Sequence, residues 1–122
     1  MVPKYLRTWF VIHFFVDYLF GIPLLIAPVW ALTIFGWQYI DPATSRLVGA
    51  ALLGIGGESL LARNASIETF KAMLNLKIIW SLAAIYGITA SIIQGTPPMG
   101  YVFLAIFAVF SAIWIYYRVK IN

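Results

Sequence analysis

The apolar stretch from Trp9 to Pro28 constrains this chain most, because it is long enough to span a bilayer and yet carries two ionisable residues. A transmembrane helix needs about 20 predominantly apolar residues. His13 and Asp17 lie four residues apart inside the stretch, and so on one face of a helix. An aspartate at the centre of a membrane helix costs about 2.5–3.5 kcal/mol on insertion scales. A later segment is therefore expected to supply a partner for Asp17.

The composition places the surface of the protein in lipid. Of 122 residues, 63% are hydrophobic and only 10% are charged, whereas about a quarter of the residues of a soluble domain are charged. The length allows four crossings of about 20 residues with short connections. The sequence predicts an all-α fold, a four-helix transmembrane bundle forming a single domain over residues 1–122, in a cell or inner membrane.

Several functional classes are excluded or disfavoured by the residue types. The net charge of +4 comes from basic residues scattered between apolar runs, so no nucleic-acid surface forms. The absence of cysteine excludes disulfides and thiolate chemistry. The glycines from Gly54 to Gly57 lie within an apolar helix, with no preceding strand and no Lys-Ser/Thr, and do not form a nucleotide-binding loop. No catalytic residues are identified, and we expect that the protein is not an enzyme.

Turn residues divide the chain into four expected spans, approximately at 9–28, 43–62, 68–94 and 99–117. Pro23 lacks an amide donor and should bend the first helix. Beyond Pro28 two alternatives remain: the first span continues through Val29–Trp37, or it breaks into a short interfacial helix. Asp41 followed by Pro42 predicts the start of the second span, and Ser66 the start of the third. Gly95 predicts the end of the third span.

The distribution of basic residues predicts the orientation of the bundle. Lysines and arginines concentrate in cytoplasmic loops of membrane proteins. Here the N-terminus, the second connection and the C-terminus are basic, while the first connection offers only Arg46 and the third has no charge. Both termini are therefore expected in the cytoplasm. The basic residues concerned are Lys4, Arg7, Arg63, Lys71, Arg118 and Lys120.

Counting depth along each expected helix places the ionisable residues in the cytoplasmic half of the membrane. We expect Asp17 to pair with Lys77, and His13 with Asp17 to form a pair that titrates near neutral pH. Two hypotheses follow. The polar residues either form a satisfied network that fixes helix register, or line a cavity that binds or conducts a small ion, a proton or a polar ligand. The ligand-binding candidates are His13, Asp17, Glu58, Lys77, Ser81 and Ser111.

Small residues and aromatics predict which faces turn inward. Ala50, Gly54 and Glu58 form a strip on the second span that permits close approach of another helix. The small and polar face of the third span should also turn inward, and it consists of Lys77, Ser81, Ala84, Ile88 and Ser91. Trp114 is grouped with the aromatics expected at a membrane interface.

Metal and cofactor sites are not expected. His13, Asp17 and Glu58 would supply one nitrogen and two carboxylates, a thin ligand set without cysteine. A haem with His13 as an axial ligand would be five-coordinate or of mixed ligation, because the chain has one histidine. We therefore predict no metal site and no cofactor.

The run FGWQYIDPATSRLVGAALLGIGGESLLAR, from Phe35 to Arg63, resembles the first loop and second helix of small four-span membrane proteins of the DoxX-like group. The resemblance implies four helices with both termini inside, and it implies no functional residues. Some DoxX-related proteins are subunits of membrane oxidoreductases, so an alternative role is a non-catalytic accessory or structural subunit of such a complex. The expected partners are the lipid bilayer and either a second copy of the chain or a partner membrane subunit. Four short helices enclose little volume, so transport would require a homo-oligomer.

Overall fold

The computed structural model describes residues 1–122 and contains five α-helices and no strand. The chain divides into two helical units, residues 2–65 and residues 66–122. The helices of the first unit are α1 (Lys4–Ile26), α2 (Pro28–Ile34) and α3 (Pro42–Leu61). The helices of the second unit are α4 (Ile67–Gln94) and α5 (Met99–Lys120). The all-helical prediction is confirmed.

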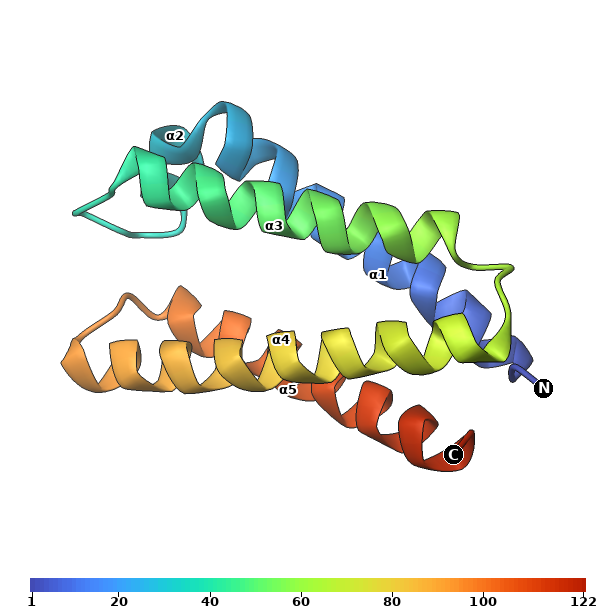
Figure 1. Ribbon diagram of the computed structural model, residues 1–122. Helices are drawn as coiled ribbons and strands as arrows, with labels where there is room; N and C mark the ends of the chain where they lie inside the picture. The colour runs from blue at the N-terminus through green and yellow to red at the C-terminus, as the bar shows by residue number, and fades with distance from the viewer. The chain divides into compact units, whose positions relative to one another are not determined.

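The first unit is built on the antiparallel packing of α1 against α3 (Figure 1). Near one end, the Arg7 guanidinium donates to the carbonyl oxygens of Arg63 and Ala65, at 2.7 and 3.2 Å. Further along, the Tyr18 hydroxyl donates to the carbonyl oxygen of Leu53 at 3.2 Å. The buried side of α1 follows the three- and four-residue spacing of one helical face. That side consists of Leu6, Phe10, His13, Asp17 and Gly21.

The first helix breaks at Ala27, which resolves the alternative left open by the sequence. Ala27 has φ −139° and ψ 63°, outside the helical region, and α2 begins at Pro28. Proline is well suited to a first helical position, because its fixed φ fits the helix and its missing N–H would have no helical partner there. Helix α1 nevertheless continues through Pro23 to Ile26. The short helix α2 then ends before Gly36, whose φ of 100° lies in the left-handed region.

The predicted helix ends are confirmed by local hydrogen bonds. The Asp41 carboxylate accepts from the Ala43 amide at 3.1 Å and from the Thr44 hydroxyl at 2.6 Å, and so caps α3. The Ser66 hydroxyl accepts from the Thr69 amide at 3.4 Å at the start of α4. At the other end of α4, Gly95 adopts φ 100°, the left-handed conformation that glycine favours.

The second unit is the antiparallel pair of α4 and α5 (Figure 1). The predicted inward face of α4 is confirmed in its first half, where Lys77 and Ser81 are buried together with Phe70, Met73 and Leu74. Toward the end of α4 burial fades, and Ser91 on the same predicted face is exposed. Helix α5 buries Ser111, Trp114 and Tyr117 in its second half. Because the helices are antiparallel, these buried halves lie at the same end of the unit.

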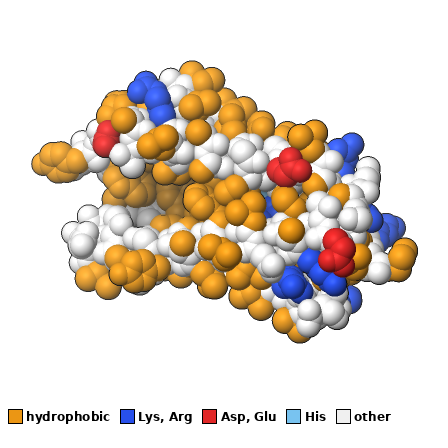
Figure 2. Space-filling view, viewed as in Figure 1, with side chains coloured by type: hydrophobic (Ala, Val, Ile, Leu, Met, Phe, Trp, Pro, Cys, Tyr) orange, Lys and Arg blue, Asp and Glu red, His pale blue; other side chains and the backbone are white.

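Three of the helices, α1, α4 and α5, are long and apolar enough to cross a membrane. Helix α3 has 20 residues but is less apolar, because Arg46, Glu58 and several glycines lower its hydropathy. Figure 2 shows many apolar side chains at the surface of the protein. Large hydrophobic residues remain exposed on all three apolar helices, among them Phe15, Leu19, Ile79, Val109 and Val119.

Asp41 gives a prediction about pH. Hydrogen bonds from the Thr44 hydroxyl, and then from the Thr44 and Ala43 amides, hold the pKa of this carboxyl below its ordinary value of 3.8. A carboxyl with a lowered folded pKa stabilises the fold above its unfolded pKa, and the stabilisation is lost as the pH falls through the folded value. Asp41→Asn keeps an N-cap acceptor but has no charge. We expect it to lower the unfolding temperature slightly at neutral pH.

The difference in unfolding temperature between wild type and Asp41→Asn should vanish well below pH 3.8. Thermal unfolding of the detergent-solubilised protein at neutral pH and at this low pH measures the difference. Ser45→Ala, a substitution in the same helical turn that leaves the carboxylate in place, is the control and should show no such pH dependence. An Asp41→Asn effect of the same size at both pH values would contradict the assignment.

Candidate functional site

His13 and Asp17 form a buried pair on α1. His13 Nε2 lies 3.2 Å from Asp17 Oδ1, and the two side chains are 5% and 6% exposed. Their four-residue spacing places both on the face of α1 that is turned away from the surface. The predicted contact between these residues is therefore confirmed. It joins two groups that can exchange a proton inside a helix long and apolar enough to cross a membrane.

The second carboxylate oxygen of Asp17 gives the pair its chemical character. Oδ2 is buried and accepts no hydrogen bond. A buried polar atom without a partner is costly, and the cost is greater for a charged group than for a neutral one. Protonation of the carboxyl group would remove its charge. An ionised carboxylate would instead keep Oδ2 as an acceptor for a cation or for a hydrogen-bond donor. One oxygen of the buried carboxylate therefore remains available as an acceptor.

Gly56 of α3 lies directly against Asp17. A Cβ atom at Gly56 would meet Asp17 Cβ at 2.6 Å and Asp17 Oδ2 at 3.2 Å. Helix α3 also approaches α1 closely at Gly49, where a Cβ would lie 2.8 Å from the Gly21 carbonyl oxygen. The absence of side chains at these two glycines lets α3 pack against the polar face of α1. Gly56 therefore determines how much room the Asp17 carboxylate has.

The strip of α3 that packs closely on α1 is not the predicted one. Ala50, Gly54 and Glu58 are exposed, and a Cβ at Gly54 would meet nothing within 4 Å. The buried positions of α3 are instead Gly49, Leu52, Gly56 and Ser59. Both strips are rich in small residues. The strip that faces α1 lies at a different rotation around α3 from the predicted strip. Glu58 consequently lies apart from the His13–Asp17 pair.

The remaining polar residue of this face is Ser59. It is fully buried, and its hydroxyl donates to the Ile55 carbonyl oxygen of its own helix at 2.7 Å. No group of three histidine, aspartate or glutamate residues in the chain is arranged to hold a metal ion.

In the second unit, Lys77 is fully buried on α4. Its Nζ lies 4.9 Å from the centroid of the Trp114 ring, a distance at which the ring face attracts a cation. Trp114, grouped by the sequence with the interfacial aromatics, is 1% exposed and so is buried among the packed helices. Arg118 bonds to Asn75 one turn further along, which places Trp114 level with Lys77.

The same unit contains two candidate serines, Ser81 on α4 one turn after Lys77 and Ser111 on α5. The Ser81 hydroxyl donates to the Ile78 carbonyl oxygen at 3.1 Å. The Ser111 hydroxyl is buried and has no hydrogen-bond partner. Trp80 Nε1 is likewise buried without an acceptor. The second unit thus contains a buried lysine and, one turn away from it, polar groups that are not satisfied by the protein.

Five of the six candidate residues fall into two groups, and Glu58 belongs to neither. His13 and Asp17 belong to the first unit, and Lys77, Ser81 and Ser111 to the second. The pairing of Asp17 with Lys77 stays a prediction. The sequence did not identify Gly56 or Trp114 as neighbours of the charged groups. Their only signal is position in the register of the antiparallel helix pairs, which is not visible before the helices are packed.

Comparison of the chain with protein-family models, with curated proteins and with solved structures finds no match.

The contact between Gly56 and Asp17 predicts a stability difference between two neighbouring glycines. Gly56→Ala should destabilise the protein by about 1–3 kcal/mol, the usual cost of overpacking a core, partly offset by the better helix propensity of alanine. Gly54→Ala is the matched control, because a Cβ there meets nothing. It should be neutral or slightly stabilising. Thermal unfolding in detergent compares the two variants, and equal effects would show that Gly56 does not limit the space at Asp17.

Proposed function

We propose that this chain is a small polytopic integral membrane protein that binds and releases a proton at the His13–Asp17 pair. The proposal has two parts: the arrangement in the membrane and the chemistry of the pair. The first rests on helix length and loop charge, and the second on the buried contact within α1.

The proposed membrane arrangement has four spans with both termini in the cytoplasm. Helices α1, α4 and α5 are long and apolar enough to cross, and we propose α3 as the remaining span because its 20 residues extend about 30 Å. The basic N-terminus, second connection and C-terminus support the orientation. A reporter fused to the C-terminus should be active only on the cytoplasmic side, and activity on the outer side would refute this orientation.

The observation that carries the proposed chemistry is the unsatisfied Asp17 Oδ2 beside His13. An unperturbed histidine changes its charge between pH 5 and 8, and a carboxylate in contact stabilises the charged imidazole. A proton is also the one cation that can join such a pair without a cavity or a coordination shell. The pair is therefore better suited to a proton than to a metal ion or an organic ligand.

Proton flux into vesicles tests the proposal. The purified chain is reconstituted into liposomes that enclose a pH-sensitive dye, and a potassium diffusion potential drives proton entry. We expect Asp17→Asn and His13→Gln each to reduce the flux by about tenfold or more, because each removes one member of the proton-binding pair. Glu58→Gln should weaken the flux less, since Glu58 is exposed on α3.

Glu68→Gln is the control for these variants. Glu68 is an exposed acidic residue at the start of α4, and its substitution changes the net charge by the same amount as Asp17→Asn. It should leave the flux unchanged. Equal flux in wild type and Asp17→Asn would refute a role for the pair. Vesicles in which the wild-type chain conducts no protons under any gradient would favour the alternative role of an accessory membrane subunit.

A further inference from the structure

The second unit is strongly polarised in charge. Its four basic residues are Lys71, Lys77, Arg118 and Lys120, and Glu68 is its one acidic residue. All five lie in the first half of α4 or in the last turn of α5. Because the two helices are antiparallel, these charges gather at one end of the unit. The opposite end, from Gln94 to Met99, has no charged side chain.

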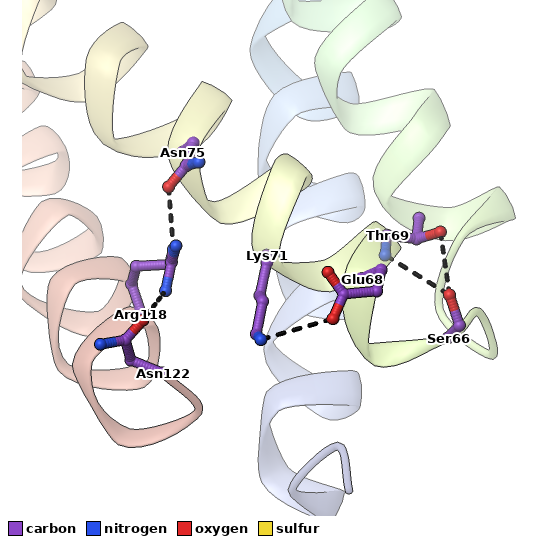
Figure 3. Close-up of polar contacts among 7 residues, drawn as sticks. All are labelled: Ser66, Glu68, Thr69, Lys71, Asn75, Arg118 and Asn122. Carbon is purple, nitrogen blue, oxygen red and sulfur yellow. Dashed lines mark hydrogen bonds and ion pairs between the residues drawn. The ribbon is translucent and has the colours of Figure 1, made fainter.

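At the charged end, a shallow groove of about 360 Å³ is lined by Asn75, Arg118, Val119 and Asn122. The Arg118 guanidinium is held between two amides (Figure 3). Its Nε donates to Asn75 Oδ1 at 2.9 Å, and its Nη1 donates to Asn122 Oδ1 at 3.3 Å. The guanidinium thus lines the groove in a fixed orientation without a carboxylate bonded to it.

The polar side chains that line this groove leave mainly hydrogen-bond donors for another partner. A guanidinium has no acceptor, so both amides must turn their oxygens toward it and keep their NH₂ groups as donors for another partner. Glu68, the acidic side chain of the unit, instead contacts Lys71 at 3.4 Å, and Lys71 lies between Glu68 and Arg118 in the view of Figure 3. A groove with a guanidinium and two amide NH₂ groups is chemically matched to a phosphate oxygen.

We propose that this groove binds the phosphate of an anionic phospholipid. The inference rests on the membrane insertion proposed above, but not on the chemistry of the His13–Asp17 pair. A lipid is favoured over free phosphate because Val119, which lines the groove, is 72% exposed, and Tyr116 beside it is 58% exposed. Lys120 Nζ lies 5.6 Å from the Tyr116 ring centroid and adds positive charge at the same level. Aromatic and basic residues of this kind collect at the headgroup region.

The test is lipid binding to the full chain, measured by native mass spectrometry with phosphatidylglycerol and with phosphatidylcholine of the same acyl chains. The decisive variant is Asn75→Asp, which keeps the shape of the side chain and its acceptor for Arg118 but places a negative charge in the groove. It should weaken phosphatidylglycerol binding by about tenfold, since loss of one donor and repulsion of the phosphate act together. Phosphatidylcholine should bind more weakly to the wild type.

Asn64→Asp is the matched control, because it makes the same chemical change in the turn between α3 and α4. It should leave phosphatidylglycerol binding within twofold of the wild type. Asn75→Asp should also keep its thermal stability, since an ion pair with Arg118 replaces the hydrogen bond. Equal binding by Asn75→Asp and wild type would overturn the proposal and leave Arg118 as a link between α4 and α5. Equal losses in both aspartate variants would also overturn it, because net charge would then explain the affinity.

Two further results separate this proposal from the others. Displacement of phosphatidylglycerol by an equal concentration of inorganic phosphate would identify a free-phosphate site and overturn the lipid assignment. Flotation with neutral phosphatidylcholine vesicles after an alkaline wash tests membrane insertion itself. A chain that floats with these vesicles but shows no preference for phosphatidylglycerol refutes the lipid site alone. A chain washed off the vesicles would refute the integral membrane arrangement on which the site depends.

Discussion

Burial of the Asp17 carboxylate inside an apolar helix is the constraint on which the first unit depends. A charge in hydrocarbon requires a partner, and His13 provides one at 3.2 Å on the same face of α1. That face can be buried only if the opposing helix carries no side chain at the level of Asp17. Gly56 satisfies this condition at Asp17. Gly49 likewise lets α3 approach α1 closely at Gly21, further along α1. The polar pair and the glycines of α3 are therefore one structural requirement.

Local features of the fold could be predicted from the sequence because they depend on residues close together in the chain. Asp41 and Ser66 accept the amide hydrogens that the first turns of α3 and α4 leave without partners. Gly95 takes a left-handed conformation that other residues avoid. The contact between His13 and Asp17 is equally local, because four residues form about one helical turn. Each of these features depends on neighbouring residues of one helix or turn and not on how the helices pack.

Features that depend on packing could not be predicted in the same way. Gly54 and Gly56 are two residues apart, which rotates them by about 200° around a helix, and both belong to strips of small residues. Composition alone does not show which strip meets α1. Trp114 likewise follows the pattern of an interfacial aromatic in sequence, but Arg118 and Asn75 fix a register that buries it against Lys77. The strip of α3 that meets α1 and the burial of Trp114 both depend on the rotation and register of each helix, which the sequence alone does not determine.

We propose that His13 exchanges a proton under the influence of Asp17, and His13 is the one histidine of the chain. Solid-state NMR of bilayer-reconstituted protein labelled with ¹⁵N-histidine therefore reports this ring alone. We expect the ring nitrogens to change protonation state as the pH is varied, because the proposed pair binds and releases a proton. The pH at which they change should differ in Asp17→Asn and stay unchanged in Asp41→Asn, since only Asp17 contacts the ring. A ring that keeps one protonation state throughout, or a midpoint unaffected by Asp17→Asn, would contradict the claim.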